Sequence, residues 1–216
     1  MRHPRQSLCT FGVTNVRYYL VTEPSYAELT GDVTETVIRE GRVVAQRPRI
    51  VTPYYLANLE GFSSDARTYF DMLANKYGPD SPGLFYTYRN EPGGLNIVSD
   101  NRVEVINKLN DEIDRKNDPL ASIIKGEDDL WDVSLMRFIF ELTCGSLQDN
   151  LRQLEARGLL GTDSCGVPID ARIRIEKMFQ QVSRGERKPA DLESEIKAWN
   201  LFEEYQDRFF SLFRSR

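Results

Sequence analysis

The sequence predicts an α+β fold in which an N-terminal antiparallel sheet with helices is followed by an all-helical C-terminal region. Aromatic and β-branched runs separated by turn residues fill the first hundred residues. Beyond residue 117 the apolar residues recur at helical spacing instead. The charged segment 114–119, DRKNDP, ends on a proline and is the expected boundary. We therefore expect an α+β domain over residues 1–116 and a helical domain over residues 117–216.

The first domain is expected to contain six strand segments and two hairpins. Glu40-Gly41 and the sequence 90–94, NEPGG, both carry residues typical of a tight turn between strands. Helices are expected to begin after Ser63 or Ser64 and after Asp100, because such side chains cap helix N-termini. The expected strands are residues 8–13, 16–22, 36–39, 42–52, 84–89 and 95–99.

Two interpretations compete for the sequence 146–161, SLQDNLRQLEARGLLG. The favoured one is a core helix that buries Leu147, Leu151 and Leu154, capped by Ser146 and ended by Gly158. The alternative is the second helix of a winged-helix-like module over 131–170, with a turn at residues 143–145. That helix would present Gln148, Arg152 and Gln153 to DNA. Residues 126–170 contain three basic and nine acidic groups, a balance that disfavours DNA binding.

Composition excludes several other classes of function. The chain has 28 basic and 33 acidic residues and a net charge of −5, which requires neither a nucleic-acid nor a membrane partner. Its single histidine, His3, disfavours a histidine-based catalytic triad. We expect no metal and no cofactor, since the acid-rich sequence 126–132, GEDDLWD, lacks a calcium-loop pattern. The sequence 163–166, DSCG, is typical of a turn.

The cysteines and the hydropathy pattern predict a cytoplasmic protein. The three cysteines show no CxxC spacing and are expected to be reduced and buried. The N-terminus lacks the apolar run of a secretory signal, and no stretch approaches the roughly 18 apolar residues needed to span a bilayer.

A ligand site is expected where arginines, tyrosines and an acid gather near Pro53 and Gly61. Guanidinium groups bind phosphate or carboxylate, and aromatic rings provide stacking surfaces. This pattern favours a small anionic ligand, although tyrosines also fill the space between sheets and helices. The candidate residues are Arg47, Arg49, Tyr54, Tyr55 and Glu60.

The C-terminal sequence 201–213, LFEEYQDRFFSLF, carries an apolar stripe on a helical wheel. We expect an ordered terminal helix packed on the chain's own helices. Phe210 lies outside the stripe and widens the apolar surface, which suggests a homodimer contact through this helix.

Together these features predict a non-enzymatic cytoplasmic binding or interaction protein with an anionic ligand or a protein partner. Two alternatives belong to other classes. One is a winged-helix DNA-binding regulator. The other is an enzyme that acts on a phosphorylated or nucleotide substrate through Arg, Tyr and Glu side chains.

Overall fold

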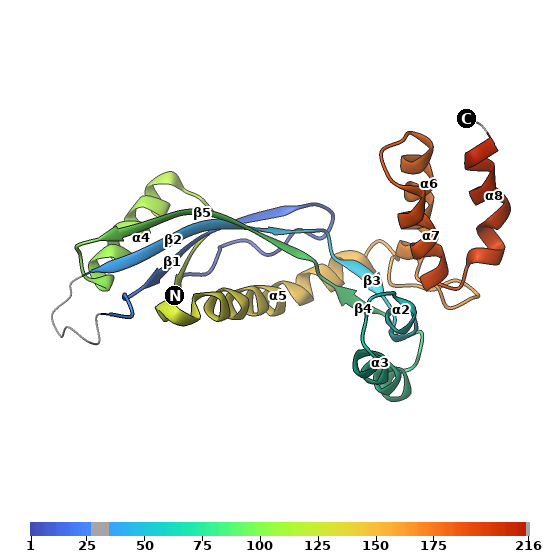
Figure 1. Ribbon diagram of the computed structural model, residues 1–216, viewed down its shortest axis with the longest axis horizontal. Coiled ribbons are helices and arrows are strands. Elements are labelled where there is room, and N and C mark those ends of the chain that lie inside the picture. Colours follow the sequence, from blue (N-terminus) through green and yellow to red (C-terminus); the bar gives the residue numbers. More distant parts are fainter. Residues whose placement is uncertain (27–34, 215–216) are drawn as a thin grey trace. The chain divides into compact units, whose positions relative to one another are not determined.

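The computed structural model describes residues 1–26 and 35–214 and has an α+β fold with a helical C-terminal part (Figure 1). The chain divides into two compact units, each built from two segments. The first unit comprises Met1–Pro48 and Tyr86–Gln153, and the second comprises Arg49–Phe85 and Leu154–Arg216. The expected boundary between residues 116 and 117 therefore falls inside the first unit.

A four-stranded mixed sheet with strand order β5-β2-β1-β6 organises the first unit. Strands β1 and β2, and β2 and β5, are antiparallel, whereas β1 and β6 are parallel. One face packs on α4 through Val105, Leu109 and Ile113. The other face packs on α5 through Leu135, Phe138 and Leu142. The elements are β1 (Thr14–Thr22), β2 (Thr36–Ala45), β5 (Tyr88–Val98), α4 (Arg102–Lys116), β6 (Ala121–Lys125), η1 (Asp128–Leu130) and α5 (Trp131–Glu155).

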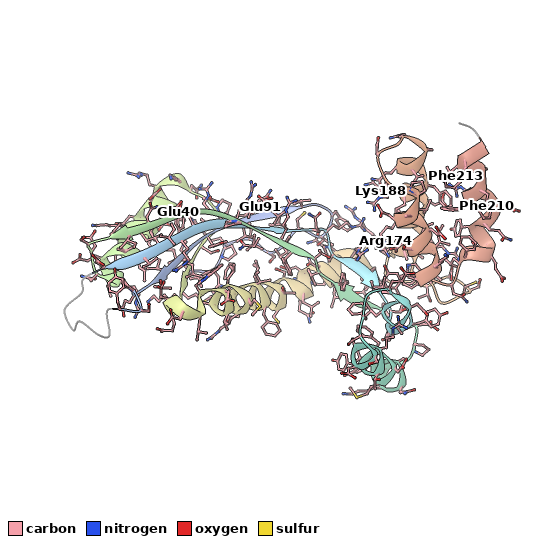
Figure 2. All side chains as sticks on the ribbon, in the orientation of Figure 1. Glu40, Glu91, Arg174, Lys188, Phe210 and Phe213 are labelled. Carbon is pink, nitrogen blue, oxygen red and sulfur yellow. The ribbon has the colours of Figure 1, made fainter. Side chains whose placement is uncertain are left out.

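Both expected hairpin turns are wrong, because the chain runs straight through them in two long strands that pair with each other. Strands β2 and β5 form one antiparallel ladder whose register shifts between Arg39 and Gly41. At two positions of this ladder, glycine allows neighbouring atoms to come close to the backbone. A Cβ at Gly41 would lie 2.3 Å from the Tyr18 hydroxyl oxygen, and a Cβ at Gly93 would lie 3.1 Å from the Glu40 carbonyl oxygen. Figure 2 labels Glu40 on β2 and Glu91 on β5.

The close approach at Gly41 leads to a stability prediction. Gly41→Ala should destabilise the protein by about 1–3 kcal/mol, because the buried Tyr18 ring must move to admit a methyl group. The matched control is Gly145→Ala, where nothing lies within 4 Å of the added atom. That change lies inside a helix and should stabilise by about 0.5–1 kcal/mol. Urea unfolding measures both, and equal midpoints for the two variants would contradict the packing role of Gly41.

Helix α5 corrects the expectation of two helices separated by a turn at residues 143–145. It is continuous over Trp131–Glu155. The hydroxyls of Thr143 and Ser146 donate to the carbonyls of Ile139 and Leu142 within the helix, so Ser146 is not an N-cap. Gly158 does follow the helix with a φ of 67°.

The buried face of α5 also differs from the expected leucine stripe. Leu154 is buried, but Leu147 and Leu151 are only half-buried. The polar residues Ser146 and Asn150 are buried instead. Ser146 accepts the Leu8 N–H at 2.9 Å, and the Asn150 amide donates to the Leu8 carbonyl at 2.8 Å. Residues 8–13, expected as a strand, form none, and the backbone of Leu8 bonds to these α5 side chains instead of to a strand.

Two further expectations fail in the described part of the chain. Residues Ala121–Lys125 form a strand, β6, although only helices were expected beyond residue 117. The three cysteines are free but exposed rather than buried.

No helix among the described residues is both long and apolar enough to cross a bilayer.

The second unit combines a two-stranded sheet with five helices around one apolar core. Strand β3 pairs antiparallel with β4. Helix α3 begins after the N-cap Ser63 and ends at Gly78, as expected. Helix α8 packs Tyr205 and Phe209 into the core, which confirms an ordered terminal helix. The elements are β3 (Arg49–Val51), α2 (Pro53–Asn58), α3 (Ser64–Tyr77), β4 (Gly83–Phe85), α6 (Ile169–Ser183), α7 (Pro189–Ala198) and α8 (Phe202–Arg214).

Candidate functional site

Four chain segments of the second unit meet around a cavity of about 450 Å³, a volume typical of small-ligand sites. They are the start of α2, the α3–β4 connection, the loop before α6 and the α7–α8 connection with the first turn of α8. We call this the acidic cavity. Its lining residues are Thr52, Tyr54, Asp80, Cys165, Gly166, Val167, Trp199, Asn200, Leu201, Glu203 and Glu204.

The loop before α6 is shaped by the Asp163 carboxylate. Its Oδ1 accepts the backbone N–H of Cys165 at 2.8 Å and that of Val167 at 3.0 Å. Its Oδ2 accepts Nε of Arg172 on α6 at 2.7 Å. Burial opposes ionisation, but these donors outweigh it and lower the pKa of Asp163. The expected turn at residues 163–166 is therefore confirmed, and it positions Cys165 and Gly166 at the cavity.

Backbone geometry brings the other walls together. Gly166 has a φ of 76° and approaches Asp80 so closely that a Cβ would lie 2.8 Å from its carboxyl carbon. The Thr52 hydroxyl caps α2 by accepting the Tyr55 N–H. The Tyr54 N–H donates to the Pro79 carbonyl at 3.1 Å, which ties α2 to the Asp80 wall.

The cavity has a strongly acidic lining. Asp80, Glu203 and Glu204 contribute carboxylates, whereas no Lys, Arg or His of the described chain is among the lining residues. Glu204 accepts Nη1 of Arg172 at 2.6 Å. Within residues 1–26 and 35–214, Asp80 and Glu203 have no ion-pair partner. The Tyr54 side chain is 39% exposed and offers an aromatic surface at the same place. The lining therefore suits a cation better than an anion.

The lining residue Trp199 is bonded to a buried network of charged side chains. Glu195 is 7% exposed and accepts four bonds: two from the Arg174 guanidinium at 2.8 and 3.0 Å, one from the Tyr55 hydroxyl at 2.9 Å and one from the Trp199 indole at 3.1 Å. Arg174 also donates to Asp170 at 3.2 Å. Figure 2 labels Arg174 on α6. The network fixes the tryptophan that forms part of the cavity wall.

The network shifts the ionisation of two of its members. Burial opposes ionisation of the Glu195 carboxyl, but the Arg174 charge and the donated hydrogen bonds prevail and lower its pKa. Burial, together with the neighbouring Glu195 charge, raises the pKa of Tyr55 to about 12. At neutral pH the network thus holds a carboxylate and a neutral phenol.

The structure separates the five residues expected to bind a ligand. Tyr54 lines the acidic cavity, and the buried Tyr55 belongs to the ion network. Arg49 lies 3.9 Å from Glu195 and its guanidinium covers the Phe85 ring. Glu60 is exposed after α2. Arg47 belongs to the first unit, where it stacks on Phe11.

Other tyrosines of the first unit fill the space between sheet and helix. Tyr86 and Tyr88 stack with ring centroids 6.4 Å apart. Their hydroxyls bond to Asn150 at 2.7 Å and to Thr143 at 2.5 Å, both on α5. These rings are therefore part of the packing of the first unit.

Sequence reasoning missed the charged residues of the network and most of the cavity wall. One available signal was an acid within an apolar helical stripe, since Glu195 lies between Leu192 and Trp199 on the buried side of α7. The i, i+4 pair of Asp170 and Arg174 on α6 is a second such signal. No local sequence pattern indicates that the four segments of the cavity wall lie close together in the fold.

The geometry assumed for DNA binding is absent from the described residues. Gln148, Arg152 and Gln153 are exposed, but they lie on the uninterrupted helix α5 rather than on the second helix of a helix–turn–helix. Arg152 pairs with Asp149 on the same helix. Structure thus gives the winged-helix alternative no support.

The fold and cavity define a class, an α+β protein with an acidic cavity in its second unit. Comparison of the chain with protein-family models, curated proteins and solved structures gave no match.

Proposed function

We propose that the protein is a non-enzymatic binding protein whose second unit holds a cationic group in the acidic cavity. The observation that carries this proposal is the charge of the lining around about 450 Å³: among the described residues it has two carboxylates without an ion-pair partner, Asp80 and Glu203, and no Lys, Arg or His. An ammonium or guanidinium group would donate hydrogen bonds to the carboxylates and lie against the Tyr54 ring. The ligand is a small amine or a basic side chain of a protein partner.

The sign of the ligand charge differs from the anion favoured by the sequence. Arg49 contacts Glu195 and Phe85, and it is not among the residues that line the cavity in the second unit. Arg172 is held by Asp163, Glu204 and Tyr205. An anion in this cavity would meet the carboxylates of Asp80 and Glu203, which have no ion-pair partner among the described residues.

Cytoplasmic localisation is part of the proposal. The three free, exposed thiols suit a reducing compartment, because exposed thiols oxidise readily elsewhere. The single histidine supports a binding role over histidine-dependent catalysis. An enzyme acting on phosphorylated substrates would need the opposite charge in the cavity.

The test is a titration with agmatine, which carries an amine and a guanidinium, followed by ¹H–¹⁵N NMR. We expect agmatine to shift the indole signal of Trp199 and leave that of Trp131, in the first unit, unchanged. Asp80→Asn combined with Glu203→Gln should weaken binding at least about tenfold, because each change removes a charge-assisted contact. Raising the salt concentration should weaken binding as well.

The matched control is Asp71→Asn, which removes an exposed carboxylate of α3 outside the lining and should leave the affinity unchanged. Inorganic phosphate and citrate serve as anionic probes. If these anions shift Trp199 while agmatine does not, the proposed cation site is wrong.

A further inference from the structure

Helix α5 has a second apolar face, opposite the one that packs on the sheet. Val133, Met136 and Phe140 are 47%, 61% and 69% exposed. Cys144 is exposed, and Leu147 and Leu151 are half-buried. With about 100° of rotation per residue, all six fall within an arc of about 80°. We call this face the α5 stripe; all of it belongs to the first unit.

Five residues of the α5 stripe, Val133 to Leu147, are arranged symmetrically about Phe140. Met136 and Cys144 lie four residues before and after it, and Val133 and Leu147 lie seven residues before and after it. A two-fold axis through Phe140 would therefore place every one of these side chains opposite an apolar side chain of a second copy. An isologous contact requires this condition.

Two charged residues beside the α5 stripe, Arg137 and Glu141, also fit a two-fold symmetric pair. Arg137 is 76% exposed at its side chain and pairs with Glu141, which is 31% exposed. Both lie on the same flank of the stripe, and in an antiparallel pair the same flanks of the two helices meet. Arg137 of one copy would then lie about 3 Å along the axis from Glu141 of the other. Antiparallel helix dipoles favour this orientation too.

We propose that a second copy of this chain docks on the α5 stripe, forming a two-fold symmetric antiparallel helix pair centred on Phe140. The paired segment from Val133 to Leu147 is about 21 Å long. Its apolar positions follow the three- and four-residue spacing of knobs-into-holes contacts. Arg137 and Glu141 set the antiparallel register.

Sedimentation velocity over a concentration series tests the proposal. The full chain should dimerise, and Phe140→Glu should weaken dimerisation at least about thirtyfold because two carboxylates would meet at the axis. The matched control is Phe210→Glu on α8, where the ring is 49% exposed and the dimer should persist. Circular dichroism confirms folding of each variant.

Charge exchange provides a second test that leaves the apolar residues unchanged. Arg137→Glu alone should weaken the dimer by opposing Glu141 of the other copy, and adding Glu141→Arg should restore it. Orientation is tested by oxidation in the background C9S and C165S. An antiparallel pair keeps the two Cys144 residues about 12 Å apart along the axis, so no disulfide should form.

Several results would overturn the proposal. A chain that remains monomeric at every concentration has no such interface. A dimer lost with Phe210→Glu but retained with Phe140→Glu would place the interface on α8, and a dimer retained in both would place it elsewhere. A Cys144 disulfide would indicate a parallel pair, contrary to the symmetry argued above.

Discussion

Glu195→Ala should destabilise the second unit by about 3–5 kcal/mol, the cost of breaking a buried ion pair by removing one partner. Arg174 would remain 16% exposed at its side chain without its main carboxylate. The Tyr55 hydroxyl and the Trp199 indole would also lose their acceptor. The free energy of unfolding is measured by denaturant titration in a Trp131→Phe background, in which Trp199 is the remaining source of tryptophan fluorescence.

The matched control is Glu193→Ala on the same helix. Glu193 is 38% exposed at its side chain and pairs with Lys197 within α7, so its loss should cost less than about 1 kcal/mol. Equal effects of the two substitutions would contradict the structural role of the network.

The Glu195 prediction has a pH dependence with a definite sign. The pKa of Glu195 is lower in the folded protein than its ordinary value of 4.5. A lowered carboxyl pKa contributes stability that is present above 4.5 and is lost as pH falls through the folded value. The unfolding free energy should therefore fall in this acidic range, and Glu195→Gln should flatten that part of the profile.

The fold could be predicted from the sequence wherever a local pattern has one structural meaning. Helix caps such as Ser63 and the apolar stripe of α8 are of this kind. Glycine is not, because it permits either a turn or a close approach. Gly41 on β2 and Gly93 on β5 lie in neighbouring strands of one ladder. This ladder is defined by pairing between residues far apart in the sequence. The strand β6 likewise depends on parallel pairing with β1.

The candidate site shows the same limit. The run around Pro53 contains Tyr54 and Tyr55, which do belong to the cavity wall and the ion network. Glu195, the partner of Tyr55, lies 140 residues away along the chain. Periodicity can place an acid on a buried helix face, but it does not identify the groups that neutralise it. The anionic ligand predicted from nearby arginines stays a prediction; in the structure Arg49 contacts Glu195 and Phe85, and Arg47 contacts Phe11.

Deleting residues 201–216 should produce the largest loss of stability. Tyr205 and Phe209 are 9% and 5% exposed in the core of the second unit, and the Tyr205 ring lies 5.5 Å from that of Phe179. Removing two buried aromatic residues should cost more than about 5 kcal/mol. Arg172 would also lose its bonds to Glu204 and Tyr205. We expect aggregation or a melting temperature many degrees lower, measured by circular dichroism and light scattering.

Point variants separate the covered face of α8 from its exposed one. Phe210 and Phe213 are 49% and 51% exposed and are labelled on α8 in Figure 2. Phe210→Ser and Phe213→Ser should each change stability by less than about 1 kcal/mol, because little apolar burial is lost. Phe209→Ala should cost about 3–5 kcal/mol, since its side chain leaves a cavity in the core. A truncated chain as stable as the full one would show that α8 does not complete this core, and the large effect of Phe209→Ala would then fail with it.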